Sequence, residues 1–168
     1  MLKKILPGLA AILAALLLAV AINTLRQGSR QIDVPPVQPL AFDENAAAQR
    51  LAAAVRLRTI SFDGQSAASA AEFRKLHALL KKSFPRAHAA LKRETVNELS
   101  LLYAWPGSDP AAKPVMLMAH QDVVPIAPGT ERDWQVDPFA GEIRDGFVWG
   151  RGAWDNKANL FAIFEAIE

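Results

Sequence analysis

The chain has 168 residues, 51% of them hydrophobic and 21% charged, which indicates a globular protein and excludes a disordered polymer. It contains no cysteine, so disulfide scaffolds, cysteine zinc fingers, iron–sulfur proteins and thiol enzymes are excluded. Residues 1–30 hold four bases and no acid, which leaves 15 bases against 17 acids elsewhere, a net charge of −2 without a basic stripe for nucleic acid.

The first 26 residues are predicted to form a membrane segment. From Ile5 to Leu25 the chain has 21 consecutive uncharged residues. A helix of this length rises 1.5 Å per residue and crosses a bilayer core of roughly 30 Å. We therefore predict a single-pass N-terminal anchor over residues 1–26, with the following part exported. The alternative is a secreted protein, released by cleavage of a signal peptide after Ala19-Val20-Ala21.

Residues 27–42 predict an extended linker. Pro35, Pro36 and Pro39 fall in this stretch, which has no helical period. The folded part is expected to span residues 43–168.

The folded part alternates helical and strand patterns, which predicts an α/β fold. Asp43 is placed to cap a helix that runs to about Arg58 and is broken over residues 59–65. A second helix is predicted over residues 69–83, where apolar side chains recur at helical spacing, and Pro85 should stop it.

Two histidines in this region are predicted to be ordinary surface or half-buried residues. His77 lies beside the apolar stripe of the second helix, and His88 follows the proline. Neither has an acidic or histidine partner at a spacing that suits a metal site.

Strand patterns dominate the next part of the chain. The run from Val115 to Ala119 is short and continuously apolar, which is typical of a strand covered on both faces. The other expected elements are strands over 92–96 and 100–105, a hairpin over 141–149 that turns at Asp145-Gly146, and a helix over 156–168.

The first polar cluster is His120-Gln121-Asp122, directly after the apolar run. Side chains at the carboxyl ends of strands in an open α/β sheet line the usual binding crevice. A histidine can bind a metal through one ring nitrogen while a nearby carboxylate holds the ring from the other side. An H-x-D triplet alone is weak evidence for this arrangement.

The second cluster is Gly150-Arg151-Gly152-Ala153-Trp154-Asp155-Asn156-Lys157, at the start of the last helix. Its two glycines allow sharp backbone turns, and Asp155 either caps the helix or offers a carboxylate to a ligand. The sequence has no P-loop, no G-x-S-x-G elbow and no H-E-x-x-H helix. Together, the imidazole of His120 and the carboxylate of Asp155 are donor types that suit Zn²⁺.

Two segments, MLMAHQDVVP and WQVDPFAGEIRDGFVWGRGAWDNKANL, resemble the co-catalytic zinc exopeptidase and aminoacylase family that includes carboxypeptidase S and secreted or membrane-anchored N-acyl amino acid hydrolases. The resemblance spans roughly residues 43–168. It implies the N-terminal half of a zinc-peptidase catalytic domain, with a mixed sheet flanked by helices, behind the N-terminal membrane helix. It further implies that His120 binds one zinc, that Asp155 bridges two, that Asp122 is a catalytic residue orienting His120, and that the Asp155-Asn156 bond is cis.

The implied activity is metal-dependent hydrolysis of amide bonds in peptides or N-acyl amino acids. A site with two zinc ions needs five protein ligands, and the resemblance places only His120 and Asp155 in this chain. The general base and the other ligands would lie beyond Glu168, as would a smaller dimerisation domain. Glu165 and Glu168 are expected to be solvated or helix-end charges.

We therefore expect a truncated chain that is inactive by itself. We also expect uncovered strand edges and an uncovered apolar face around Phe161 and Phe164. The alternative function is a membrane-anchored, non-catalytic fragment or pseudoenzyme that acts as an interaction module. A metal-dependent phosphoesterase with an H-x-D start ranks lower, because it leaves the G-R-G-x-x-D-x-K match unexplained.

Overall fold

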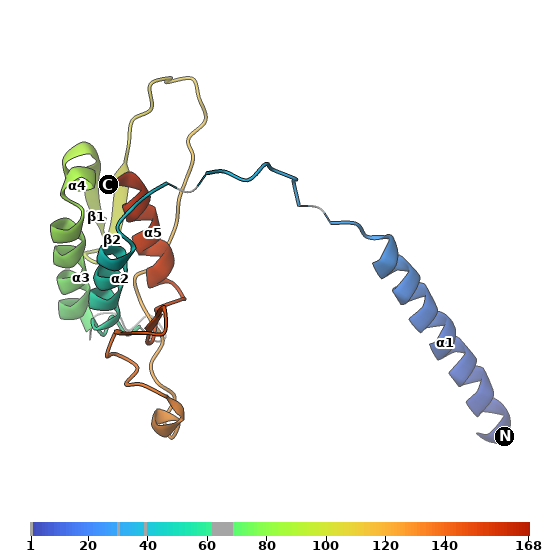
Figure 1. The fold of residues 1–168 in the computed structure, drawn as a ribbon. Coiled ribbons are helices and arrows are strands. Elements are labelled where there is room, and N and C mark those ends of the chain that lie inside the picture. Colours follow the sequence, from blue (N-terminus) through green and yellow to red (C-terminus); the bar gives the residue numbers. More distant parts are fainter. Residues whose placement is uncertain (1, 30, 39, 62–68) are drawn as a thin grey trace. The chain divides into compact units, whose positions relative to one another are not determined.

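A computed structural model describes residues 2–29, 31–38, 40–61 and 69–168, and the chain divides into two compact units, 1–41 and 42–168. The first unit holds one helix, α1 (Leu2–Arg26), drawn in blue in Figure 1. Within Ile5–Arg26 an 18-residue window has a mean hydropathy of 2.7, which suits a membrane span and equally a signal sequence. Arg30 and Pro39 of the predicted linker, and 62–65 of the predicted helix break, lie outside the described residues.

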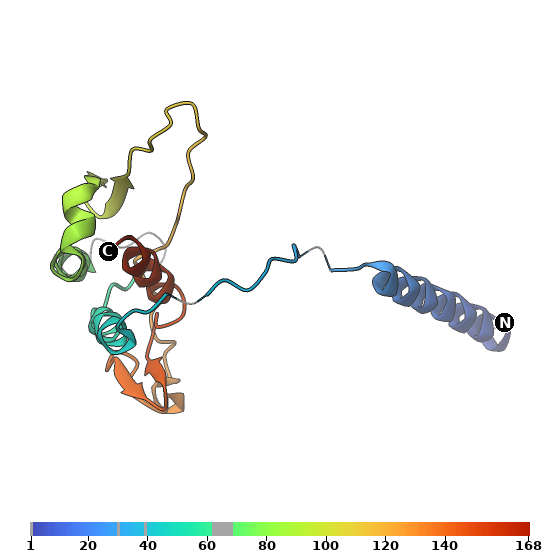
Figure 2. The same cartoon turned by 45° about the horizontal axis from the view of Figure 1, so that its top comes forward.

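Three helices lie side by side in the second unit, α2 (Glu44–Val55), α3 (Ala70–Ser83) and α5 (Lys157–Ile167), as Figures 1 and 2 show. The first of them begins as the sequence predicts, because the carboxylate of Asp43 accepts a hydrogen bond of 2.9 Å from the backbone N–H of Ala46. It ends at Val55, a turn earlier than predicted. Helices α3 and α5 match their predicted ranges to within one residue at each end.

A fourth helix, α4 (Pro85–Ala90), was not predicted from the sequence. The proline stops α3, as expected, but it also occupies the first position of the next helix. Proline is well suited to that position, because its fixed φ is helical and the N–H that it lacks would have no partner there. The chain therefore turns at Phe84 and continues as a second, shorter helix.

The described strands form two separate antiparallel pairs. Strand β1 (Lys92–Val96) pairs with β2 (Ser100–Ala104), and β3 (Glu142–Arg144) pairs with β4 (Phe147–Trp149). The sequence predicted the strands of the first pair to within one residue, without their pairing, and predicted the second pair as a hairpin. The second turns at Asp145 and Gly146, whose φ angles of 54° and 79° are typical of a tight hairpin turn.

The prediction of a strand over residues 115–119 is wrong. The described residues also do not form the expected mixed sheet, because their strands make only the two antiparallel pairs. Residues 115–118 are 65–87% exposed and belong to a long loop that projects beyond the helices (Figure 1). A strand needs a neighbour to accept and donate backbone hydrogen bonds, and no described segment pairs with this one. The only described parallel contact is a single bridge between Ile60 and Val123.

The expectation that Phe161 and Phe164 are uncovered is also wrong. They are 2% and 4% exposed, because Phe84 of the α3–α4 corner packs against both. The Phe84 ring stacks on Phe164 at a centroid distance of 5.1 Å and meets Phe161 edge-on at 5.6 Å. The ring of Tyr103 of β2 meets the ring of Phe164 at nearly a right angle, with a centroid distance of 5.2 Å. The apolar face of α5 therefore forms the centre of the core.

Glu165 of α5 and Glu168, which follows its last residue, both accept hydrogen bonds from neighbouring elements and are not solvated charges. Glu165 accepts two hydrogen bonds of 2.6 Å from the guanidinium of Arg50, which joins α5 to α2. Glu168 is a helix-end charge, as expected, but it caps a different helix. Its carboxylate accepts from the backbone N–H groups of Arg86 and Ala87 at the start of α4.

Lys157 at the start of α5 is fully buried. Its Nζ donates to the backbone carbonyls of Ala54 and Leu57, at 2.8 and 2.7 Å, where α2 ends. Burial lowers the pKa of Lys157 to about 8, against a smaller opposing effect of Glu72. A neutral amine still has two N–H groups, so loss of the proton leaves both hydrogen bonds in place.

The lowered pKa of Lys157 predicts a pH dependence of stability. Between pH 8 and 10.5 the unfolded chain keeps the lysine proton while the folded chain has lost it, so the free energy of unfolding rises with pH across this window. The rise is expected to reach at most about 3 kcal/mol, from 1.36 kcal/mol per pKa unit. Urea unfolding at several pH values should show it in the wild type and not in Lys157→Met. Equal pH slopes in the two proteins would contradict this assignment.

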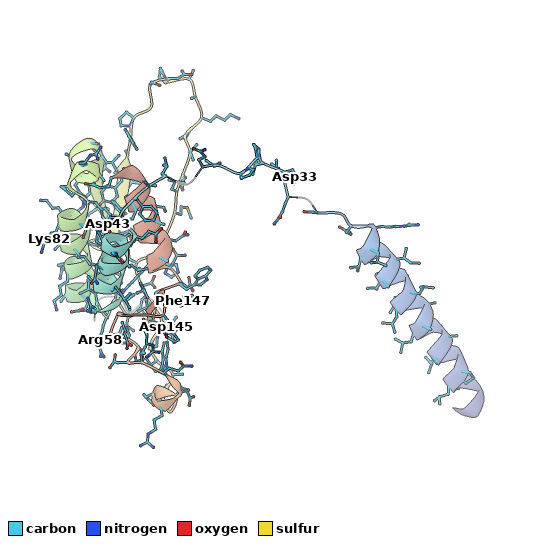
Figure 3. All side chains as sticks on the ribbon, viewed as in Figure 1. Asp33, Asp43, Arg58, Lys82, Asp145 and Phe147 are labelled. Atoms are coloured by element: carbon cyan, nitrogen blue, oxygen red, sulfur yellow. The ribbon has the colours of Figure 1, made fainter. Side chains whose placement is uncertain are left out.

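Replacing Phe84 by alanine should strongly destabilise the fold. The ring is fully buried between α3, α4 and α5, and truncating such a residue costs about 3–5 kcal/mol. Phe147 is the matched control, because its ring is 67% exposed on the second hairpin (Figure 3). Phe147→Ala should change the free energy of unfolding by less than about 0.5 kcal/mol. Similar losses from both variants in urea unfolding would contradict the packing described here.

Candidate metal centre

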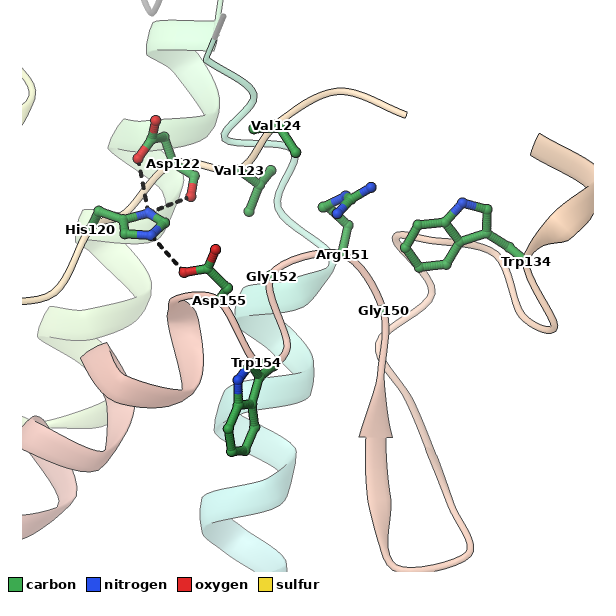
Figure 4. A pocket seen from close by; sticks show the side chains of 10 residues that line it. All are labelled: His120, Asp122, Val123, Val124, Trp134, Gly150, Arg151, Gly152, Trp154 and Asp155. Carbon is green, nitrogen blue, oxygen red and sulfur yellow. Dashed lines mark hydrogen bonds and ion pairs between the residues drawn. The ribbon is translucent and has the colours of Figure 1, made fainter. Parts of the chain in front are cut away.

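Two segments that are distant in the sequence meet at one site. Nε2 of His120 lies 2.9 Å from Oδ1 of Asp155, which precedes α5 by two residues (Figure 4). On the other side of the ring, Nδ1 of His120 lies 3.1 Å from Oδ1 of Asp122 and 3.0 Å from the carbonyl oxygen of Asp122. The structure therefore brings together all three site residues that the sequence singled out.

The imidazole of His120 is held between two carboxylates. Burial lowers the pKa of His120, but hydrogen bonds to Asp155 and Asp122 outweigh this effect and hold the pKa above its ordinary value. The side chains are open to solvent, with exposed fractions of 49% for His120, 42% for Asp122 and 78% for Asp155. Because both acceptors at Nδ1 are oxygens that cannot donate, Nδ1 carries a proton and Nε2 is the nitrogen directed at Asp155.

The loop that carries Asp155 fits closely against the other segment. Gly152 has a φ of 82°, and a Cβ at this position would lie 2.5 Å from Cγ1 of Val123. Only glycine combines this backbone conformation with so close an approach. The N–H of Lys157 donates to the carbonyl of Gly152 at 3.0 Å, which closes the loop. The Asp155-Asn156 bond is cis, as the resemblance implies.

The segment that carries His120 is hydrogen-bonded to Thr59, a buried residue that the sequence did not single out. Oγ1 of Thr59 donates to the carbonyl of Gln121 at 2.7 Å, and the carbonyl of Thr59 accepts from the N–H of Val123 at 2.9 Å. The next bond runs from the N–H of Ser61 to the carbonyl of Val123. No sequence signal marks Thr59, because its role depends on its position beside a distant segment.

His77 was predicted to be a surface or half-buried histidine, but it is buried and contacts the segment that carries His120. It is 7% exposed on α3, and its Nε2 lies 2.8 Å from Oε1 of Gln121. Burial lowers the pKa of His77, although the hydrogen bond with Gln121 opposes this effect. His88 is half-buried, as predicted, and bonds Tyr103 away from the site.

The site opens into a cavity of about 220 Å³. Arg151 is the only permanent cation among the described residues that line this cavity, and its guanidinium lies 5.0 Å from the ring centroid of Trp134. Neither residue was predicted to belong to the site. The cavity is lined by His120, Asp122, Val123, Val124, Trp134, Gly150, Arg151, Gly152, Trp154 and Asp155 (Figure 4).

The donor set suits a zinc ion but supplies only part of its coordination. Zn²⁺ binds imidazole nitrogen and carboxylate oxygen at about 2.0–2.2 Å, and Nε2 of His120 already faces Oδ1 of Asp155. Asp122 holds the opposite ring nitrogen, the usual arrangement behind a zinc-bound histidine. Within the described residues, no three histidine or acidic side chains are arranged so that all of them could hold one metal ion, since Asp122 faces the far side of the His120 ring.

Comparison with known proteins agrees with this chemistry. Residues 116–168 match the model of peptidase family M20/M25/M40. The chain is 47% identical over 131 residues to carboxypeptidase S of Saccharomyces cerevisiae, an alignment that covers 74% of this chain and 23% of that protein. It is 42% identical over 137 residues to the N-fatty-acyl-amino acid synthase/hydrolase of Mus musculus, covering 77% of this chain and 26% of that protein.

A longer alignment extends the likeness towards the N-terminus. The chain is 38% identical over 165 residues to the probable carboxypeptidase S-like 2 of Dictyostelium discoideum, covering 94% of this chain and 31% of that protein. It thus spans between a fifth and a third of the length of these relatives. The chain belongs to peptidase family M20/M25/M40, a group of metal-dependent peptidases and amidohydrolases.

Proposed function

We propose that this chain carries part of the active site of a zinc-dependent hydrolase that cleaves amide bonds in peptides or N-acyl amino acids. His120 and Asp155 bind the metal, and Asp122 orients His120. The single observation that carries the proposal is the 2.9 Å contact between Nε2 of His120 and Oδ1 of Asp155. These residues stand 35 positions apart in the sequence, and their side chains converge on one point beside a cavity.

Each of the three polar residues has a separate role in this proposal. When bound, zinc polarises the scissile carbonyl and lowers the pKa of a water molecule. Asp122 keeps the proton on Nδ1 of His120, which leaves Nε2 free to bind the metal. Asp155 is the more exposed of the two carboxylates, and it would hold the metal together with Nε2 of His120.

The proposed substrates follow from the relatives and from the cavity. The relatives include a carboxypeptidase S and an N-fatty-acyl-amino acid synthase/hydrolase. Apolar groups line the cavity beside the candidate metal ligands, and they include Val124, Trp134 and Trp154. This lining is compatible with an apolar acyl or side-chain group next to the amide.

The residues described here do not form a complete active site. Asp122 and Asp155 are the only carboxylates that line the cavity in the part of the chain that the structure describes, and both already have roles. We propose that the general base and the remaining zinc ligands come from other residues of the complete active site. The 168-residue chain alone should then bind zinc weakly and show no turnover.

The proposed cellular arrangement is a single-pass anchor formed by residues 1–26, a linker over residues 27–42 and an exported catalytic part over residues 43–168. The length and hydropathy of the segment Ile5–Arg26 support the anchor. Cleavage after Ala21 and secretion is the competing arrangement.

Zinc binding tests the metal assignment. Asp155→Asn keeps the shape of the side chain but removes its charge, so it should weaken zinc binding at least about tenfold, and His120→Asn should do the same. Asp145→Asn is the matched control, because Asp145 lies in the exposed turn of the second hairpin. Isothermal titration calorimetry at pH 7.5 measures the three affinities relative to wild type.

Equal affinity in all four proteins would refute the metal assignment. No zinc binding by the wild type would favour the alternative, a non-catalytic module. An amide-hydrolysis assay of the zinc-loaded chain completes the test. Turnover by these 168 residues alone would contradict the proposal that further ligands and a base are needed.

A further inference from the structure

Gln121 lies between the two polar residues of the H-Q-D segment, and its side chain is held at both ends of the amide. Nε2 of Gln121 donates to the carbonyl of Leu99 at 3.0 Å. Because a carbonyl oxygen only accepts, the amide nitrogen must face Leu99 and Oε1 must face His77. His77 therefore donates from Nε2, across 2.8 Å, to Oε1 of Gln121.

His77 is fixed in place and can therefore hold the amide of Gln121 in one orientation. It is 7% exposed and lies on α3 next to Leu76, a core residue with no exposure. Burial disfavours the charged imidazolium, and it lowers the pKa of His77, so the ring is neutral near pH 7 with its proton on Nε2. Neither the ring nor the helix that carries it can move without disturbing the core.

Of residues 115–119, which precede His120, only Ala119 packs against the core. Residues 115–118 are exposed and lie in the projecting loop (Figure 1). On the other side of His120 the chain is fixed by the side-chain amide of Gln121 and by two hydrogen bonds with Thr59, one from its hydroxyl to the carbonyl of Gln121 and one from the N–H of Val123 to its carbonyl. Thr59 fixes the backbone, whereas the Gln121 side chain fixes the rotation of the segment about its own axis. That rotation determines where the ring of His120 points, because side chains of an extended segment alternate between its faces.

We infer that His77 is a positioning residue for the metal ligand His120, acting through the side-chain amide of Gln121. This inference rests on the proposed metal site. It assigns a role in the site to His77, which lies on α3 and does not line the cavity. Loss of the His77 hydrogen bond should leave both candidate ligand atoms in place in the sequence, Nε2 of His120 and Oδ1 of Asp155. The ring of His120 would then no longer be held in the orientation that directs Nε2 at Asp155. Changes in groups that orient metal ligands typically weaken metal binding by 10–100-fold.

Three variants separate positioning from general stability. His77→Phe keeps a ring of similar size and removes the donor, and His77→Gln restores an N–H donor of similar reach. His88→Phe is the matched control. Its ring makes two comparable hydrogen bonds, to the carbonyl of Phe84 at 2.8 Å and the hydroxyl of Tyr103 at 2.9 Å, but has no contact with Gln121.

The readout is Co²⁺ affinity and the visible absorption spectrum of the bound cobalt, measured on the full chain. His77→Phe should weaken Co²⁺ binding by about tenfold and alter the spectrum, whereas His77→Gln recovers most of the affinity and His88→Phe keeps it. Urea unfolding of each variant shows how much stability is lost. Equal Co²⁺ affinity in wild type and His77→Phe, or equal losses in His77→Phe and His88→Phe, would overturn the inference.

A second measurement separates this inference from the metal-site proposal. Imidazole ¹⁵N NMR of the metal-free chain reports whether the His120 ring occupies one hydrogen-bonded state. If the wild type binds no Co²⁺, the metal-site proposal fails, and the NMR spectra then decide on positioning. Averaged His120 signals in His77→Phe, beside a single state in wild type and His88→Phe, would support it. A single His120 state in His77→Phe would overturn it.

Discussion

The contact between the imidazole of His120 and the carboxylate of Asp155 is the interaction on which the site depends. Two carboxylates and one imidazole meet there, and without a cation the negative charges of Asp122 and Asp155 would repel each other. Hydrogen bonds to Asp155 and Asp122 outweigh the effect of burial and raise the pKa of His120, which favours the imidazolium that offsets this repulsion. A divalent ion at the same position would supply more positive charge and displace the proton.

Packing brings these groups together from distant parts of the chain. Gly152 lies against Val123, which joins the Asp155 loop to the His120 segment, and Lys157 ties the start of α5 to the end of α2. The core beneath is formed by aromatic rings of α5 and the α3–α4 corner. The side chains of the site are therefore open to solvent, whereas the elements that carry them pack against the hydrophobic core.

Local patterns predicted the local structure correctly. The cap at Asp43 and the turn at Asp145-Gly146 depend on a few neighbouring residues, and both were confirmed. The strand over 115–119 failed because pairing depends on a partner that no local pattern supplies. The His120–Asp155 contact was expected only through the family resemblance, since spacing cannot show which loops meet. His77 and Thr59 carry no signal at all, because their importance comes from lying beside Gln121 in space.

X-ray absorption spectroscopy at the zinc edge tests the central claim most directly. The zinc-loaded chain should show light-atom ligands at about 2.0–2.2 Å, together with the multiple scattering of an imidazole. The imidazole signal should vanish in His120→Asn and persist in His88→Phe, which removes a histidine that bonds Tyr103 and does not line the cavity. Zinc bound without an imidazole, or an imidazole signal that survives the loss of His120, would contradict the claim that His120 and Asp155 converge on one metal ion.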